Sequence, residues 1–160
     1  MPRSEAVALV EALRSRGLRM SAAESCTGGL LGAEITSMPG ASEVFLGSAV
    51  TYSNESKISV LDVSGSTLMA HGAVSTETAR EMARGSVRAY GSDVAVSITG
   101  IAGPGGGTAE KPVGTVCMAV SDGERDVATK FVFNGDRDSV REQSVKEACR
   151  LLIDFIGGRL

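Results

Sequence analysis

The segment that most constrains the fold of this chain is a short apolar run near its middle, Val94–Ile98. A run of this length and composition is typical of a strand in a sheet that is covered on both faces, because neither face offers side chains suited to water. A sheet of this kind needs helices on both sides. We therefore expect an α/β domain built in three layers, α/β/α.

The remaining segments alternate between strand-like and helix-like patterns. The two last strand-like segments are joined by a short turn at Asp122-Gly123, which predicts an antiparallel hairpin within a mixed sheet. Asn54 is a suitable N-cap for a short helix. No internal repeat or linker interrupts the chain, so we expect one domain over residues 1–160. The expected strands are 18–23, 44–52, 94–98, 115–121 and 127–133, and the expected helices are 4–16, 30–37, 55–61, 76–90 and 137–156.

Composition and charge exclude several classes of protein. The net charge of −3 argues against a general binder of nucleic acid or of membrane surfaces, which would need a basic excess. No apolar run approaches the roughly 18 residues that span a bilayer, and the N-terminus has the pattern of an amphipathic helix and not of a signal peptide. Cys26, Cys117 and Cys149 lack metal-ligand spacing and are expected to be reduced thiols. We therefore expect a cytoplasmic protein without a metal.

The first candidate site is the turn at Ser25, where a strand ends and a helix begins. Such a turn exposes the serine and directs unpaired N–H groups of the first helical turn toward the same space. These donors suit a phosphate or the oxyanion that forms when an amide is attacked. Gly28 and Gly29, beside Thr27, favour a bound ligand because they let it approach the backbone closely. The alternative is that Ser25 only caps the helix.

A serine nucleophile needs a base within hydrogen-bonding reach. His71 has the pattern of a residue at the C-terminal end of a helix, so we favour Lys57 and a Ser–Lys variant of the triad. Lys57 is expected in the first turn of a helix, where the helix dipole and burial both favour its neutral form. The hydroxyl of Tyr52 could orient the lysine or relay a proton. The alternative is a solvated lysine beside Glu55.

Two further clusters are candidates for binding substrate. Arg137 and Arg141 are four residues apart on one helical face and could bind a phosphate together, although pairing with Asp136 or Asp138 is an equal alternative. A glycine-rich loop follows the buried strand, and such loops commonly border ligand crevices in open α/β sheets. Its spacing matches neither a Walker motif nor a dinucleotide fingerprint. The residues of this loop that we expect to contact substrate are Thr99, Gly100 and Gly103.

Taken together, six blocks of sequence resemble the CinA C-terminal domain family, the stand-alone nicotinamide-nucleotide amidases. The resemblance runs from about residue 5 to about residue 155, with the blocks in the family's order. Two-domain CinA proteins carry an additional N-terminal domain, and we expect this chain to correspond to the C-terminal domain alone. The blocks are Ala23–Gly29, Thr51–Asn54 with Lys57, His71–Ser75, Gly100–Pro104, Lys111–Thr115 and Gly135–Arg137.

The resemblance implies a mixed five-stranded sheet in the order 2-1-3-4-5 with strand 4 antiparallel. It implies hydrolysis of nicotinamide mononucleotide to nicotinate mononucleotide and ammonia in pyridine-nucleotide salvage, without a cofactor. The family's Ser, Tyr and Lys fall on Ser25, Tyr52 and Lys57, and its Gly-Asp-Arg element falls on Gly135–Arg137, which we expect to serve the nucleotide phosphate. A homodimer is also implied.

Two other hypotheses stay open at this point. Cys26 is adjacent to Ser25, and a helix N-terminus would lower the pKa of its thiol, which would make it the nucleophile instead. Alternatively, the chain is a nucleotide-binding or protein-interaction module of the same fold without catalysis.

Overall fold

A five-stranded mixed sheet forms the centre of the computed structural model, which describes residues 1–160. The strand order is β2-β1-β3-β4-β5. Strands β1, β2 and β3 are parallel, whereas β4 is antiparallel to both of its neighbours, so the predicted topology is confirmed. The strands are β1 (Met20–Glu24), β2 (Phe45–Val50), β3 (Val94–Gly100), β4 (Thr115–Ser121) and β5 (Asp126–Val132).

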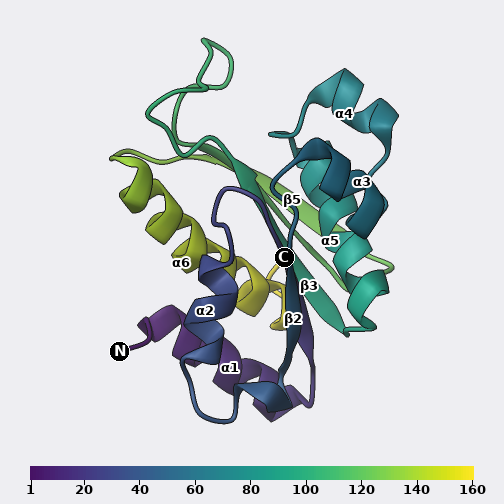
Figure 1. Ribbon diagram of the computed structural model, residues 1–160. Coiled ribbons are helices and arrows are strands. Elements are labelled where there is room, and N and C mark those ends of the chain that lie inside the picture. The colour runs from purple at the N-terminus through teal and green to yellow at the C-terminus, as the bar shows by residue number, and fades with distance from the viewer.

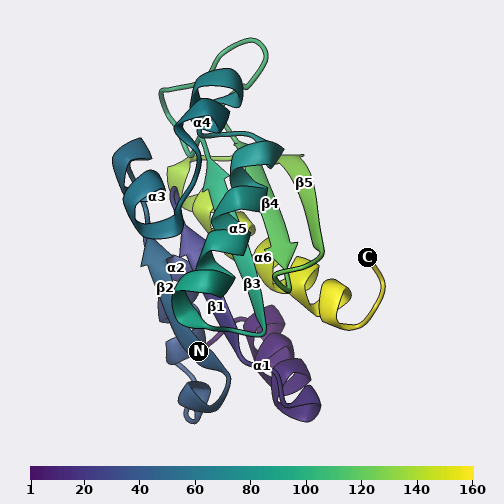
Figure 2. The ribbon, with the colours of Figure 1, turned by 90° about the vertical axis from the view of Figure 1, so that its right-hand side faces the viewer.

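Helices cover both faces of this sheet, as Figures 1 and 2 show. One face is covered by α1, α2 and α6, and the other by α3 and α5, with α4 packed against α5. The three-layer arrangement predicted from the buried strand is therefore present. The helices are α1 (Ser4–Arg16), α2 (Leu30–Thr36), α3 (Asn54–Leu61), α4 (Gly65–His71), α5 (Thr76–Tyr90) and α6 (Arg137–Ile156), with a 3-10 turn η1 (Ala41–Glu43) before β2.

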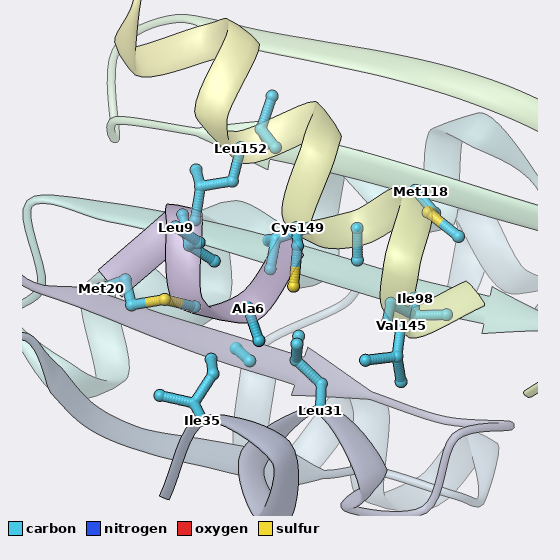
Figure 3. Close-up of a cluster of buried hydrophobic side chains, with 14 of the residues drawn as sticks. Ala6, Leu9, Met20, Leu31, Ile35, Ile98, Met118, Val145, Cys149 and Leu152 are labelled. Atoms are coloured by element: carbon cyan, nitrogen blue, oxygen red, sulfur yellow. The ribbon is translucent and has the colours of Figure 1, made fainter. Parts of the chain in front are cut away.

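The largest of three buried apolar clusters forms the core between the sheet and helices α1, α2 and α6. Leu9 of α1, Leu31 of α2 and Leu152 of α6 point toward Met20 and Ile98 of the sheet (Figure 3). The two smaller clusters lie on the opposite face. The core under α3 and α5 contains Ala23, Ala49, Leu61, Val63 and Met82, and the cluster between α5 and β4 contains Ala79, Ala83, Cys117 and Ala119.

The differences from the predicted elements are local. Ser53, not Asn54, is the N-cap of α3, because its hydroxyl accepts a hydrogen bond from the Ser56 N–H. The prediction identified a helix end at His71 but not the whole of α4, whose seven residues bury no side chain. No helix in the structure has the length and apolar character that crossing a membrane requires.

Candidate functional site

Ser25 lies where three parallel strands end side by side. The register pairs Glu24 of β1 with Val50 of β2 and with Ile98 of β3. The residues that follow these three are therefore neighbours, which places Ser25 between Thr51 and Thr99. The carboxyl ends of parallel strands are the usual position of ligand sites in open α/β sheets.

The alternation of side chains along β1 directs Ser25 and Glu24 to opposite faces. Met20 and Ala22 pack into the core under α1, α2 and α6, and Ala23 packs into the core under α3 and α5. Glu24 continues the first series and faces α2. Ser25 continues the second series and faces α3.

Lys57 of α3 meets Ser25 on this face. The Lys57 side chain is buried, with 1 % of the residue exposed, and its Nζ lies 3.1 Å from the Ser25 Oγ. The same amine donates a hydrogen bond of 2.8 Å to the backbone carbonyl of Thr51. Burial lowers the pKa of Lys57 because the ammonium form loses its hydration. The proximity expected from the sequence is therefore present, and so is the shift toward a neutral amine.

The depth of Lys57 depends on how closely α3 approaches α5. Gly85 of α5 lies against the end of α3, where a Cβ would be 2.0 Å from the carbonyl oxygen of Leu61. Only a glycine at this position lets the two helices pack so closely. The capping box formed by Ser53 and Ser56 fixes the start of α3, so that Lys57, its fourth residue, reaches down to the sheet edge.

Cys26 is a poor candidate for the nucleophile. Burial raises the pKa of its thiol to about 11, so that the thiol is protonated at neutral pH. A thiolate at this position would raise the pKa of Lys57, but a neutral thiol offers no such charge. The state of Cys26 therefore favours the neutral form of Lys57.

The turn after Ser25 differs from the prediction. The N–H groups at the start of α2 were expected to face a ligand, but they donate to the buried carboxylate of Glu24. Gly29 N–H (3.1 Å) and Leu31 N–H (3.0 Å) share one oxygen, and Gly32 N–H (3.0 Å) binds the other. Thr27, Gly28 and Gly29 do not line the pocket described below. Glu24 thus occupies the N–H donor of Gly29, and the Gly28 N–H donates to the Ser25 carbonyl. The ligand-binding role expected for Thr27, Gly28 and Gly29 stays a prediction.

A pocket of about 300 Å³ opens over Ser25 and Lys57. This volume is at the lower end of the range for small-molecule sites. One wall is the loop after β3, and it includes the predicted residues Thr99, Gly100 and Gly103. Seven further lining residues were not among the predicted substrate contacts, and most of them are small or apolar and carried no signal of their own. They are Asn54, Ala73, Val74, Ile101, Ala102, Gly105 and Gly106.

Arg137 and Tyr52 line the same pocket and contact each other. Arg137 donates one hydrogen bond to the Gly103 carbonyl (2.8 Å) and another to the Tyr52 hydroxyl (3.1 Å). Tyr52 is 61 % exposed and makes no hydrogen bond to Lys57. The carbonyl of Thr51, and not Tyr52, therefore makes the direct contact that holds the amine, and the expected role of Tyr52 in orienting the lysine or relaying a proton stays a prediction.

Arg141 lies away from the pocket. Its guanidinium donates to the carbonyls of Cys26 (3.2 Å) and Thr27 (3.0 Å), and it approaches Asp138 only to 4.0 Å. Arg141 therefore supports the turn after Ser25. The expectation that Arg141 shares a phosphate with Arg137 stays a prediction, although two of its donors are directed to the backbone.

Several backbone donors of the pocket have no backbone acceptor within the protein. Those of Cys26, Ala102 and Gly103 are among them, and all three residues line the pocket. His71 ends α4 as predicted and lies outside this pocket. No three His, Cys, Asp or Glu side chains come together in a way that could hold a metal ion.

Comparison with known proteins identifies this architecture. A CinA superfamily protein from Klebsiella pneumoniae is similar in structure with a TM-score of 0.93 and 35 % identity, covering 96 % of each chain. The competence/damage inducible protein CihA from Agrobacterium tumefaciens has a TM-score of 0.90 and 36 % identity, covering 98 % of each chain.

Curated relatives are similar in sequence but longer. A CinA-like protein from Chlorobaculum tepidum is 50 % identical over 150 residues, which cover 91 % of this chain and 36 % of that protein. The chain thus spans about a third of the length of the curated relatives it matches. The CinA C-terminal domain family matches residues 3–156. The chain belongs to the CinA C-terminal domain family.

Proposed function

We propose that this domain is a serine/lysine amidohydrolase that converts nicotinamide mononucleotide and water to nicotinate mononucleotide and ammonia. The observation that carries the proposal is the buried amine of Lys57, 3.1 Å from the hydroxyl of Ser25 at the floor of a pocket. A base and a nucleophile at this separation have the geometry that covalent catalysis requires.

In the first half of the reaction, the neutral amine of Lys57 takes the proton of the Ser25 hydroxyl. The Ser25 oxygen forms a bond to the carboxamide carbon, and the carbonyl oxygen becomes an oxyanion. The unpaired N–H groups of Cys26, Ala102 and Gly103 are the donors available to stabilise that oxyanion. The C–N bond then breaks, and Lys57 returns its proton to the leaving nitrogen, which departs as ammonia.

In the second half, water resolves the ester between Ser25 and the nicotinate nucleotide. Lys57, neutral again, takes a proton from water, and the oxygen of that water forms a bond to the ester carbon. The bond to the Ser25 oxygen breaks, Ser25 regains its proton from Lys57, and nicotinate mononucleotide leaves. The Thr51 carbonyl holds the amine in place through both halves.

The shape and charge of the pocket support a nucleotide as the substrate. Its floor carries the two catalytic groups, so the carboxamide would enter first. Arg137, at the pocket beside the Gly103 carbonyl and the Tyr52 hydroxyl, retains N–H donors for a phosphate. No step needs a cofactor.

Ammonia release from nicotinamide mononucleotide is the direct test. We expect turnover by the wild-type domain and a loss of about a thousandfold or more in Ser25→Ala and in Lys57→Ala, since the two groups act as a unit. Binding of the nucleotide, measured by calorimetry, should survive in both variants. Near-normal turnover in either variant would refute the catalytic roles. Binding without turnover in the wild-type protein would favour a nucleotide-binding module instead.

A further inference from the structure

We propose that Glu24 is a positioning residue that fixes the geometry of Ser25, and that it excludes the substrate phosphate from the start of α2. This inference rests on the proposed function of the Ser25 site. Glu24 immediately precedes Ser25 but points to the opposite face of the sheet, and 0 % of it is exposed. It does not line the pocket, so it acts on the reaction only through the backbone.

The carboxylate of Glu24 is fully engaged. Its two oxygens accept the three N–H donors of the α2 start, from Gly29, Leu31 and Gly32, and the hydroxyl of Ser48 at 2.8 Å. A carboxylate offers about four acceptor positions, so these four donors leave no capacity for another partner. A substrate phosphate could bind at the start of α2 only if it displaced the carboxylate of Glu24, which is buried and is part of the chain.

These bonds join the two ends of the turn that carries Ser25. The backbone of Glu24 is held in the sheet by its pairing with β2 and β3, while its side chain holds the first turn of α2. The chain between them is closed further by the Gly28 N–H, which donates to the Ser25 carbonyl at 3.0 Å. The side chain of Glu24 therefore sets the distance from the end of β1 to the start of α2, and Ser25 lies between these two fixed points.

The glycines of the turn fit this role. Gly28 and Gly29 have φ of +57° and +99°, which side chains rarely adopt, and these values bring the chain back over the carboxylate. The glycine-rich sequence after Ser25 thus accommodates an internal anion and not a bound ligand.

The test compares Glu24→Gln with two controls in the ammonia-release assay. The amide of Gln has the size of the carboxylate but presents N–H groups to N–H donors. We expect kcat to fall about a hundredfold, because a small displacement of a nucleophile has an effect of this order. KM should stay within about threefold of wild type, since the pocket is not touched. An unchanged kcat in folded protein, or a rise in KM that accounts for the whole loss, overturns the proposal.

The controls separate positioning from charge and from general destabilisation. Glu11→Gln removes one negative charge from an exposed position of α1, and Ser48→Ala removes a single donor while leaving the three backbone bonds. Both should keep kcat within about threefold of wild type. A Glu11→Gln variant as slow as Glu24→Gln would show that net charge is responsible and would overturn the proposal.

Two further measurements keep the proposal testable. If Glu24→Gln does not fold, hydrogen exchange in the wild-type protein is the test. The Gly29 and Leu31 amides have no helical acceptor, so we expect strong protection only if they bind the Glu24 carboxylate. Exchange at the rate of free amides overturns the proposal.

If the wild-type protein releases no ammonia, the proposed function fails separately. Labelling of Ser25 by phenylmethylsulfonyl fluoride, followed by mass spectrometry, should then be slower in Glu24→Gln than in Glu11→Gln, and equal rates overturn the proposal.

Discussion

Two buried ionisable side chains, Glu24 and Lys57, lie on either side of the end of β1, and they differ in the number of their hydrogen-bond partners. On the α2 face, the carboxylate of Glu24 accepts four hydrogen bonds, three of them from backbone N–H groups. On the α3 face, the amine of Lys57 has only the Thr51 carbonyl and the Ser25 hydroxyl as partners. No carboxylate pairs with Lys57.

This difference separates a structural role from a chemical one. A buried charge persists when enough hydrogen bonds replace its hydration, and it is neutralised when they do not. Lys57 has only two hydrogen-bond partners in place of its hydration, and burial lowers its pKa. The Glu24 side organises the backbone around Ser25, whereas the Lys57 side supplies a base.

The largest expected effect comes from making the charge on position 57 permanent. Lys57→Arg keeps a long cationic side chain, but a guanidinium cannot lose its proton in a protein. We expect ammonia release to fall about a thousandfold or more. Lys146→Arg, the same substitution at a partly exposed position of α6, should leave turnover unchanged. Substantial activity in Lys57→Arg would contradict the role of Lys57 as a base.

Arg137 offers the next largest effect, in binding and not in chemistry. Hydrogen bonds between charged groups contribute about 1.5–3 kcal/mol, so Arg137→Ala should raise KM for the nucleotide about 10- to 100-fold. Nicotinamide riboside, which lacks the phosphate, should show little change in KM. Arg141→Ala, which loses contacts to the turn alone, should affect both substrates alike. Equal losses for both substrates in Arg137→Ala would exclude phosphate recognition.

The contrast also predicts a pH dependence of stability. Because the pKa of folded Lys57 lies below its unfolded value of 10.5, the unfolded state binds more protons between the two values. Stability therefore rises with pH across that window, by about 1.4 kcal/mol for each pH unit it spans. Urea unfolding should show wild type gaining stability relative to Lys57→Met as the pH is raised toward 10.5. A difference that does not change with pH would indicate a lysine of ordinary pKa.

Cys26 provides the smallest expected effect. Its thiol is protonated at neutral pH, because burial raises its pKa to about 11. Cys26→Ala should therefore keep ammonia release within about threefold of wild type, since it removes a small buried group and no reacting atom. If Cys26→Ala lost as much turnover as Ser25→Ala, the result would indicate that Cys26 is the nucleophile.

Much of the fold followed from local pattern. The apolar run at Val94–Ile98 predicted helices on both faces, and the turn at Asp122-Gly123 predicted the β4–β5 hairpin, because both signals act over a few residues. The meeting of Ser25 and Lys57 was also predictable. Ser25 directly follows β1 and Lys57 lies in the first turn of the helix that follows β2, and the ends of parallel strands converge on one edge of the sheet.

The roles of Glu24 and Tyr52 were not predictable in the same way. The Glu24 carboxylate binds amides five to eight residues further along, a contact that exists only once the Gly28–Gly29 turn has its three-dimensional shape. A buried carboxylate at the end of an otherwise apolar strand was the available signal. The backbone carbonyl of Thr51, which no side-chain pattern reveals, holds the amine that Tyr52 was expected to orient.

The most direct test of the account is the titration of Lys57 itself, followed by NMR of its labelled side-chain amine, with Lys57→Met to assign the signal. We expect a midpoint below 10.5 that coincides with the acid limb of kcat/KM for ammonia release, so that the amine is neutral where the domain is active. A midpoint at or above 10.5 would contradict the account, because Ser25 would then face an ammonium ion and not a base.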